Sequence, residues 1–471
     1  MRKNNRALFS GTANPASLTD DSDPSAEPLR VVMFVASFRP LPEGGTEKQC
    51  RLLAAELARR GHEVTVVTCW LGKGAPRKER LDGVLVRRLG CGHPLSGLAR
   101  KMKALIRAGN GKQSAIAPSA NLRMIPSRAG QRPILTAPLL WLEYLAFLTA
   151  LAAWFVRHRQ NVDLLHVHES HWLAGFVAWM GNCGRLPVLV KEATFPVLAP
   201  TVAPVPGRGI WDRCRLRAAY IAQTGPAARE LEAGGVDPNK IHILPNGVHI
   251  PAERARPEFS REVLFVGNLH QGAELKGFDV LFGAWCRVAA ASPGARLLVV
   301  GAGDPSAWQE FVRSRGVAES VTFCGPSRNL GCWYARAAML VLPSRREGMS
   351  NAVLEAQAWG LPVVVSDLPG CRAAVLPGQT GFVVPVGNEE MLAAAIVRLL
   401  DQPEQRERMG RAAHEWARRQ FAFSVIANAV ESCYRGVMAE FQDGGAAKCM
   451  KPQTRHAATY GDAGCSSESV E

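Results

Sequence analysis

The chain has 471 residues, enough for about two or three domains at roughly 100–200 residues each. Hydrophobic residues make up 47% and charged residues 21% of the chain, which excludes a wholly disordered or fibrous protein. Lysine and arginine number 56 against 41 aspartates and glutamates, so the formal net charge is +15. Such a charge points to an anionic partner: nucleic acid, a membrane surface or a phosphorylated substrate.

The cysteines and the two ends of the chain indicate a cytosolic protein. Twelve cysteines stand singly between Cys50 and Cys465, without a Cys-x-x-Cys pair or zinc-finger spacing to a histidine. This pattern favours reduced thiols. Residues 1–28 are polar and lack the apolar core of a signal peptide, so we expect a disordered leader. Residues 442–471 have a similar composition and are expected to form a disordered tail.

From residue 29 onward, the elements alternate as in a Rossmann-type unit. Residues 29–36 are apolar and β-branched and predict a first parallel strand. A Gly-Gly loop at 44–45 precedes a predicted helix at 46–60, which Gly61 ends as a C-cap, and a strand at 64–68 follows. The loop does not match G-x-G-x-x-G, so the pattern alone does not specify a dinucleotide.

One apolar segment is long enough to raise the question of a membrane span. Residues 139–156 are borderline in length for a span and contain Glu143. A strand-like segment at 163–167 follows closely, as in the helix-to-strand connections of α/β domains. We therefore expect a buried or interfacial helix, with a transmembrane helix as the alternative.

Residues 83–142 interrupt the alternation of strands and helices. They hold ten basic residues and no aspartate or glutamate, so they carry +10 of the net charge of +15. We expect a basic insert at about 90–135, serving either as a solvated segment without a role or as a surface for anionic membranes. The near absence of aromatic residues argues against nucleic acid. The basic residues are Arg87, Arg88, Arg100, Lys101, Lys103, Arg107, Lys112, Arg123, Arg128 and Arg132.

The remaining strands divide into two series. We expect two doubly wound α/β domains facing each other across a cleft, an N-terminal one over residues 29–248 and a C-terminal one over 249–418, with ligands at the carboxyl ends of the strands. Helices at about 419–438 should cross back to the first domain. Predicted strands lie at 163–167, 188–191 and 220–223, and then at 262–267, 296–301, 321–324, 339–342, 362–365 and 381–384.

The most informative segment is PSRREGMSNAVLEA at residues 343–356, which follows a strand and opens a helix. Backbone N–H groups at a helix N-terminus, together with the helix dipole, bind phosphate. Glu347 lies at the mouth of the turn and Glu355 about two helical turns further on. A carboxylate accepts two hydroxyl donors at once, which suits a sugar ring or a ribose. The alternative is a capped helix with an acidic first turn.

This segment, PS-x-x-EGMSNAVLEA-x-A-x-G-x-PVV, resembles the signature of family-4 retaining glycosyltransferases of the GT-B fold. Four other parts of the chain agree with that family in the same order, and the resemblance covers about residues 29 to 438. They are Gly44-Gly45-Thr46-Glu47 with the GHEV segment at 61–64, DLLHVH at 163–168, PNGV at 245–248 and Lys276-Gly277.

The resemblance implies roles for individual residues. Lys276 would neutralise the departing diphosphate, Glu347 would contact the donor sugar's hydroxyls, and His168 would lie near the reacting carbon; these are the catalytic candidates. His166 is expected to be structural. Glu355 would accept the ribose hydroxyls, and glycine in the first loop would let the backbone approach the phosphates. The donor-binding candidates are Gly44, Gly45, Asn268, Met349, Ser350, Asn351, Ala352 and Glu355.

The chain departs from the family pattern in both predicted domains. Asn268 stands where the family often carries an arginine that contacts the diphosphate, and His270, Arg345 or Arg346 would have to replace that charge. In the N-terminal half, residues 191–194 read Lys-Glu-Ala-Thr where many members have a histidine-containing segment. The second departure concerns the acceptor.

The implied function is transfer of a sugar, with retention, from a nucleotide-sugar, most simply a UDP-sugar. The acceptor would be a hydroxyl of a lipid-linked or envelope glycan, and the enzyme would lie on the cytoplasmic membrane face. No Asp-x-Asp lies in a plausible site, so neither a metal nor another cofactor is expected. Alternatives are a glucosyltransferase with a soluble acceptor, a nucleotide-sugar epimerase, or an inactive basic membrane-binding module. The presence of Lys276, Glu347 and Glu355 favours an active enzyme.

Overall fold

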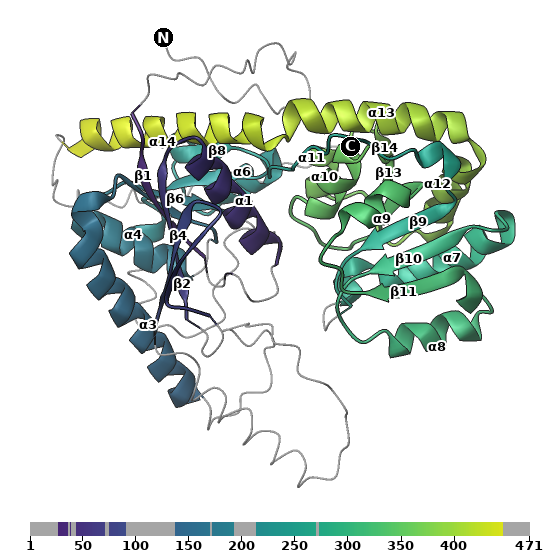
Figure 1. Ribbon diagram of the computed structural model, residues 1–471, viewed down its shortest axis with the longest axis horizontal. Coiled ribbons are helices and arrows are strands. Elements are labelled where there is room, and N and C mark those ends of the chain that lie inside the picture. The colour runs from purple at the N-terminus through teal and green to yellow at the C-terminus, as the bar shows by residue number, and fades with distance from the viewer. Residues whose placement is uncertain are drawn as a thin grey trace, which may run out of the picture.

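The structure is a computed structural model that describes residues 27–35, 38, 44–70, 75–90, 137–169, 172–192, 213–269 and 273–445. Two α/β domains lie side by side, and two long consecutive helices run along one side of both (Figure 1). The expected leader as far as residue 26, residues 91–136 of the basic stretch and the expected tail from residue 446 lie outside the described residues.

The N-terminal domain is built on an eight-stranded sheet with the order β3-β4-β2-β1-β5-β6-β7-β8. Its pairings are parallel except that of β3 with β4. Val31 of β1 lies opposite both Val64 and Leu164, so the chain winds outward from β1 in both directions and the ligand position is beyond the carboxyl ends of these strands. The strands are β1 (Arg30–Phe34), β2 (Glu63–Cys69), β3 (Lys78–Leu81), β4 (Val84–Leu89), β5 (Leu164–Val167), β6 (Val188–Lys191), β7 (Ala219–Ala222) and β8 (Ile241–Ile243).

Helices bury both faces of this sheet. One face packs against α1 and α14, with Leu57 and Val430 in the core, and the other packs against α3, α4 and α6, with Leu151 and Val177. Burial on both faces explains why the strands read as continuous apolar runs. The helices are α1 (Gly45–Arg59), α3 (Ala137–His158), η2 (Arg159–Asn161), α4 (Trp172–Gly184), α6 (Gly225–Ala233), η3 (Pro238–Lys240) and α14 (Phe423–Gly445).

The C-terminal domain has a six-stranded sheet, all parallel, with the order β11-β10-β9-β12-β13-β14. Its strands are β9 (Glu262–Val266), β10 (Arg296–Val300), β11 (Val321–Gly325), β12 (Met339–Leu342), β13 (Val363–Ser366) and β14 (Gly381–Val384). Its helices are η4 (Pro257–Phe259), η5 (Ala273–Lys276), α7 (Phe278–Ala291), α8 (Ser306–Ser314), η6 (Ala318–Ser320), α9 (Gly331–Arg336), α10 (Asn351–Ala358), α11 (Pro369–Ala374), α12 (Glu389–Asp401) and α13 (Pro403–Gln420).

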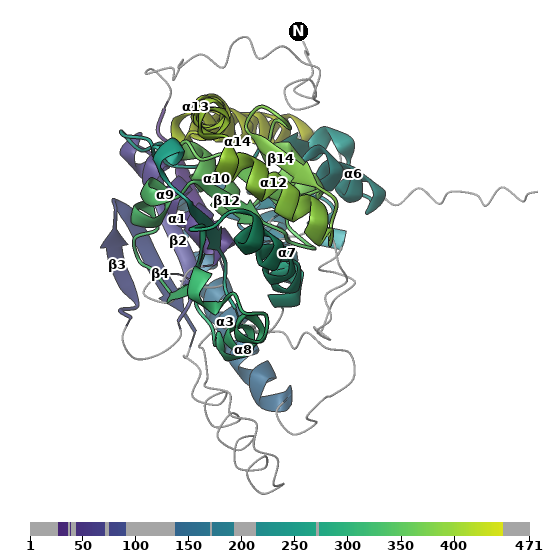
Figure 2. The same ribbon diagram turned by 90° about the vertical axis from the view of Figure 1, so that its right-hand side faces the viewer.

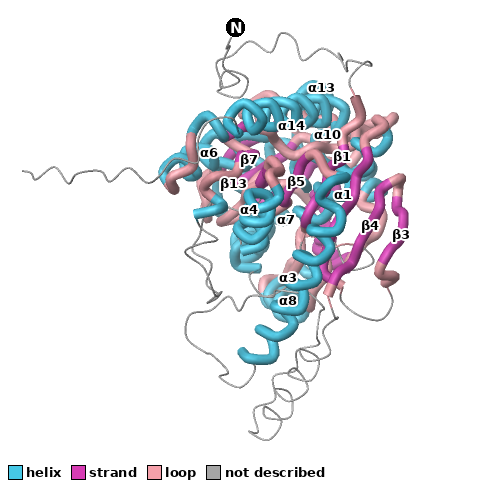
Figure 3. Tube along the Cα trace, turned by 90° about the vertical axis from the view of Figure 1, so that its left-hand side faces the viewer, coloured by secondary structure: helices cyan, strands magenta, loops and turns pink. Residues whose placement is uncertain are grey.

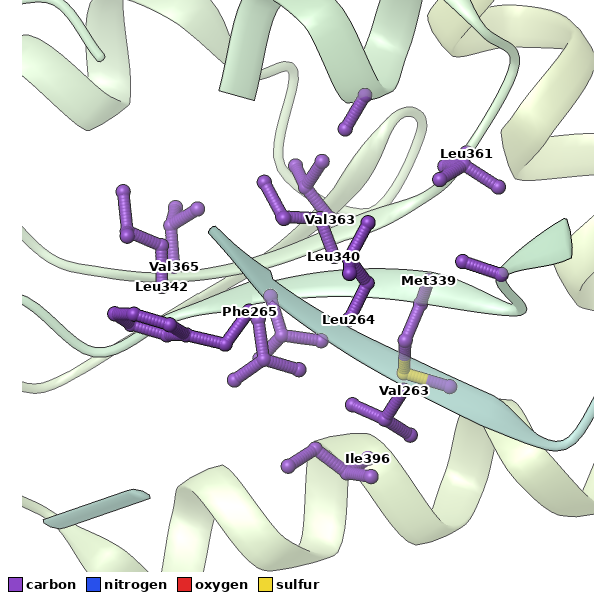
Figure 4. Packing of buried hydrophobic residues seen from close by; sticks show 14 of the residues in the cluster. Val263, Leu264, Phe265, Met339, Leu340, Leu342, Leu361, Val363, Val365 and Ile396 are labelled. Carbon is purple, nitrogen blue, oxygen red and sulfur yellow. The ribbon is translucent and has the colours of Figure 1, made fainter. Parts of the chain in front are cut away.

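The centre of this second domain is a dry apolar layer. Figure 4 shows side chains of β9, β12 and β13 beside one another, with Ile396 of α12 packed below them. Leu264 lies opposite Leu298 on one side and Leu340 on the other, and all three are buried. Two doubly wound α/β domains are therefore confirmed. The rigid sheet holds the loop after β12 and the start of α10 in place.

The hairpin of β3 and β4 differs from the prediction for residues 83–142. Asp82 and Gly83 turn the chain with φ of 51° and 80°, as an Asp-Gly pair does in a tight hairpin. β4 pairs with β2, and Figure 3 shows β3 beyond it at the edge of the sheet. Arg88 is 2% exposed and ion-paired with Glu79, so it belongs to the sheet, ahead of the basic insert expected at about 90–135. The prediction that the alternation of strands and helices is interrupted from residue 83 is therefore wrong, because β4 occupies Val84–Leu89.

The apolar segment at 139–156 forms most of α3. Phe147, Leu151 and Phe155 are buried against the sheet and α4. Among the described residues, no helix has the combination of length and hydropathy that a membrane span needs. The expectation of a buried or interfacial helix is confirmed, while residues 137–144 are described only in their backbone.

The two connections between the domains lie against each other. Val248, between β8 and β9, exchanges backbone hydrogen bonds of 2.7 and 3.1 Å with Phe421 and Phe423, between α13 and α14. A Cβ on Gly247 would lie 2.5 Å from the ring of Phe423, so glycine permits this approach. α13 then packs on the second domain and α14 on the first, as Figures 1 and 2 show. Both chain segments that connect the domains therefore pass through this paired crossing.

Glycine is required where η5 meets α7. Gly277 follows Lys276, caps α7 and has a φ of 68°, in the left-handed region. A Cβ there would lie 2.0 Å from the backbone oxygen of Pro343, at the end of β12. This contact joins the loop of Lys276 to the loop that leads to Glu347.

We expect Gly277→Ala to destabilise the chain more than Gly294→Ala. Both alanines would adopt a positive φ, at a cost of roughly 1–2 kcal/mol. Gly294, however, has nothing within 4 Å of the added Cβ, whereas Gly277 also meets Pro343. Urea unfolding followed by circular dichroism would measure both. Equal losses would show that the Gly277–Pro343 contact relaxes without cost.

Candidate active site

Two helix N-termini meet between the domains. α1 begins at Gly45 after β1, and α10 begins at Asn351 after β12. The Asn351 side-chain amide donates to the Gly45 carbonyl at 3.2 Å, and a Cβ on Gly45 would lie 3.0 Å from that nitrogen. Each N-terminus presents N–H groups without an intrahelical partner and the positive end of a helix dipole. Their convergence favours an anion at this position.

Buried amide side chains hold the two helices together. Gln49 of α1 donates to Asn351 Oδ1 at 3.0 Å and to the Gly247 carbonyl at 2.8 Å, and it accepts from the Gly247 N–H at 3.1 Å. Gln49 and Asn246 are 4% and 3% exposed. Asn246, in the PNGV segment, donates to the same Asn351 oxygen at 3.1 Å. The predicted donor residue Asn351 thus also serves as the centre of the interdomain contact.

Met349 is likewise occupied by contacts with the first domain. Its N–H donates to Gln223 Oε1 at 3.1 Å, and its sulfur accepts from the Asn246 N–H at 3.3 Å. Ser350 is buried, and its carbonyl accepts the first intrahelical bond, from Leu354 at 3.2 Å. The Met349 amide is therefore used within the protein. Of the predicted backbone donors, those at the start of α10, Asn351 and Ala352, are the ones the helix itself leaves without a partner.

Glu355 lies on α10 with both carboxylate oxygens in polar contacts. Oε1 accepts from Lys48 Nζ of α1 at 2.6 Å, and Oε2 accepts from the Tyr334 hydroxyl at 3.1 Å. Burial, and secondarily Glu355, raises the pKa of Tyr334 well above its ordinary value, so the phenol remains a hydrogen-bond donor. A carboxylate offers about four acceptor positions, so Glu355 can still receive further hydroxyls.

Lys276 and Glu347 contact each other, although 71 residues separate them. Glu347 Oε1 accepts from Lys276 Nζ and, at 2.9 Å, from the Ser344 hydroxyl. The Glu347 side chain is 12% exposed and that of Lys276 34%. The structure brings together the two residues that the resemblance assigns to the donor sugar and to the diphosphate.

Residues considered as replacements for the missing arginine have other contacts. Asn268 Oδ1 accepts from the Ala302 N–H at 3.1 Å, which fixes the loop after β10. Arg345 forms two hydrogen bonds to Asp279, of 2.5 and 2.6 Å, at the start of α7. Arg346 is exposed, and His270 lies outside the described residues. The structure instead places the unanticipated Lys48 beside the predicted ribose site.

His168 is fully buried at the carboxyl end of β5. Its two ring nitrogens have no hydrogen-bond partner among the residues that the structure describes. Burial lowers the pKa of His168 well below its ordinary value, with smaller contributions from His166 and Lys191. His166 Nδ1 lies 2.7 Å from the Tyr434 hydroxyl, and burial lowers its pKa to about 3. Both imidazoles are therefore neutral near pH 7, so His168 can exchange hydrogen bonds but does not serve as a cation.

Further titratable groups lie near the same sheet edge. Lys191 ends β6, is 5% exposed, and has a pKa that burial lowers to about 8. Glu169 follows β5, and burial, then Glu47 and Glu192, raise its pKa to about 8. Lys191 and Glu192 depart from the family pattern in sequence, but their burial depends on neighbouring strands and helices and has no local signal. Lys191, Glu169 and Glu192 lie on the N-terminal domain, which is the domain expected to receive the acceptor.

Comparison with known proteins agrees with this arrangement. Residues 43–250 match the model described as Glycosyltransferase Family 4, and residues 260–402 match that described as Glycosyl transferases group 1. A D-inositol 3-phosphate glycosyltransferase of Kineococcus radiotolerans is 30% identical over 461 residues, which cover 87% of this chain and 96% of that protein.

Solved structures show the same fold. Sucrose-phosphate synthase from Thermosynechococcus elongatus has a TM-score of 0.63 at 20% identity, covering 87% of this chain and 99% of that one. HepE of Anabaena, solved in complex with UDP, has a TM-score of 0.61 at 15% identity, covering 87% and 100%. The chain therefore belongs to the family-4 glycosyltransferases and has the GT-B fold.

Proposed function

We propose that the chain transfers a sugar from a UDP-sugar to an acceptor hydroxyl, with retention and without a metal ion. The observation that carries the donor assignment is the meeting of the N-termini of α1 and α10 beside two lysine–glutamate pairs, Lys48–Glu355 and Lys276–Glu347. Helix ends and lysines suit a diphosphate, and carboxylates suit the hydroxyls on either side of it. The complexes of HepE with UDP and UDP-glucose support uridine as the nucleoside.

The donor site accounts for departure of the nucleoside diphosphate. Negative charge grows on the leaving phosphates, and Lys276 with the two helix ends can stabilise it electrostatically. The bond from the anomeric carbon to the diphosphate oxygen breaks and the sugar becomes oxocarbenium-like. The acceptor hydroxyl attacks on the face from which the diphosphate leaves, and its proton passes to the departing phosphate oxygen. Glu347, held by Ser344 and Lys276, orients the sugar's hydroxyls as a hydrogen-bond acceptor. Closure of the domains about Val248 would exclude water from the reacting carbon.

Two acceptor classes have support. The first is a lipid-linked or envelope glycan, favoured by the net charge and by the exposed side of α3 described below. The second is a small soluble phosphorylated cyclitol. The name of the Kineococcus radiotolerans relative, which is 30% identical over most of both chains, favours this second class. Both acceptors would enter from the N-terminal domain, where His168 and Lys191 lie.

The membrane proposal rests on the exposed side of α3, because residues 91–136 of the basic stretch lie outside the described residues. Leu148 is buried, and the Trp141 side chain lies outside the described residues. Leu145, Thr149, Ala153 and Val156 are exposed at spacings of four, four and three residues, so they form one uncharged stripe. Thr149 donates its hydroxyl to the Leu145 carbonyl at 2.9 Å, so this hydroxyl is already hydrogen-bonded within the helix. Arg157 and Arg159 follow the stripe and are exposed.

The function is tested with a panel of UDP-, GDP- and ADP-sugars, each offered with inositol phosphate or with a lipid-linked glycan. We expect turnover of a UDP-sugar, unchanged in excess EDTA, and a product whose anomeric configuration by NMR matches that of the donor. Loss of turnover on chelation with recovery on adding Mg²⁺ or Mn²⁺ would contradict the metal-free mechanism. An inverted product would contradict retention.

The two glutamates should have different effects on binding and turnover. Glu355→Gln replaces a charged acceptor of the ribose hydroxyls, at a cost of roughly 1–3 kcal/mol, so UDP affinity should fall about tenfold or more. Glu347→Gln should keep or raise UDP affinity, because Lys276 loses its anionic partner, while turnover falls at least tenfold. Titration calorimetry and initial rates would measure both.

Glu407→Gln is the matched control for this pair. Glu407 is 20% exposed and ion-paired with Arg254, compared with 16% exposure for Glu355. It lies on α13, away from the N-terminus of α10. We expect UDP binding by this variant to equal that of the unmodified chain. Unchanged UDP affinity in Glu355→Gln would contradict the proposal that Glu355 accepts the ribose hydroxyls.

Vesicle sedimentation tests the membrane proposal. The chain should bind anionic vesicles more than neutral ones and should be released in large part by high salt, because lysine and arginine near an anionic bilayer contribute about 1 kcal/mol each. Leu145→Asp should weaken binding, whereas Met391→Asp should not, because Met391 is similarly exposed, at 48% against 47%, but lies on α12 of the other domain. Equal binding to both vesicle types, or to neither, would contradict this proposal.

A further inference from the structure

We propose that Lys48 is a donor-binding residue contributed by the N-terminal domain, so that the diphosphate lies between one lysine from each domain. This inference rests on the proposed function. Lys48 contacts the carboxylate assigned to the ribose, and Lys276 contacts the carboxylate assigned to the sugar. In a nucleotide-sugar, the diphosphate joins these two groups. Lys48 would therefore lie at the ribose end of the diphosphate and Lys276 at the sugar end. Each side chain would be within reach of a phosphate.

The backbone of Lys48 is held in place by α1. It lies in the first turn of α1, where its N–H donates to the Gly44 carbonyl at 3.1 Å. The neighbouring Gln49 fixes α1 against Asn351 and Gly247. The Lys48 side chain is 31% exposed and spans the interface to Glu355, 307 residues away in the chain. Its ammonium thus reaches into the second domain while its backbone stays in the first.

The charges around the site indicate why a second lysine is needed. Asn268 supplies no charge where the family often has arginine, and Arg345 is engaged by Asp279. Lys276 alone would face a diphosphate while paired with Glu347. Before the donor arrives, the two lysines and two glutamates balance each other. Once donor hydroxyls bind the carboxylates, both ammonium groups can turn toward the more highly charged phosphates.

An ion pair as exposed as Lys48–Glu355 contributes little to holding the two domains together. Partly exposed pairs contribute little to stability, and Gln49 with Asn246 already joins the domains through hydrogen bonds to Asn351. A diphosphate would engage Lys48 more strongly because it carries more charge than a single carboxylate. Nucleotide affinity would then depend on the contact between the domains, since one of the two cations comes from α1.

The test compares UDP with uridine, which shares the ribose but lacks phosphates. Calorimetry or ligand-observed NMR should show that Lys48→Met weakens UDP at least tenfold and changes uridine affinity less than twofold. Lys48→Arg should restore most of the UDP affinity, because it keeps the charge. Lys240→Met is the matched control, since Lys240 is a surface lysine that donates to the Arg217 carbonyl, and it should bind UDP normally.

The outcomes separate this inference from the proposed function. Unchanged UDP affinity in Lys48→Met would overturn the inference that Lys48 binds the donor. Equal losses for UDP and uridine would also overturn it, because Lys48 would then act only by placing Glu355 at the ribose. Absence of UDP binding by the unmodified chain would contradict the proposed donor itself. Thermal unfolding of each variant would establish that α1 remains folded.

Discussion

The contact between the N-termini of α1 and α10 is the constraint on which the rest of the site depends. Two helix ends that carry partial positive charge face each other between the domains, an arrangement that is unfavourable unless acceptors or anions lie between them. Gln49 and Asn246 donate to Asn351 Oδ1, Gln223 Oε1 accepts from the Met349 N–H just before α10, and Glu355 supplies negative charge. A nucleoside diphosphate would add the charge that these helix ends favour. In the proposed function, the geometry that joins the domains is also the geometry that would bind the donor.

The two chain segments that link the domains cross at Val248 and Ala422. In the proposed function, a rotation about this point would change the separation of α1 and α10. Lys48 and Gln49 would then move with the first domain, and Glu355 and Glu347 with the second. Donor binding and exclusion of water are therefore expected to be linked in one motion.

Much of this fold was predictable from sequence because its strands are buried on both faces and stand out as apolar runs between glycine turns. The segment at 343–356 also carries its own signal, since it combines a strand end, two carboxylates and a helix start. The hairpin of β3 and β4 was missed because basic residues at 87 and 88 obscured the alternation. Only tertiary packing shows that Arg88 is buried and paired with Glu79.

The contacts across the interface could not be predicted in this way. Lys48 and Gln49 look like ordinary polar residues of a helix, and Gln223 like the end of a strand; their partners lie more than a hundred residues away. The sequence assigned Lys276 and Glu347 to separate parts of the donor, and nothing local indicates that they touch. Burial of His168 and Lys191 likewise depends on neighbouring strands and on helices that return from the end of the chain.

The central claim is that the donor binds where α1 meets α10. An experimental structure of the chain with UDP bound would test it most directly. We predict that the ribose hydroxyls donate to Glu355 and that the diphosphate lies against the two helix N-termini, between Lys48 and Lys276. UDP bound elsewhere, or bound at α10 with its ribose away from Glu355, would contradict this account.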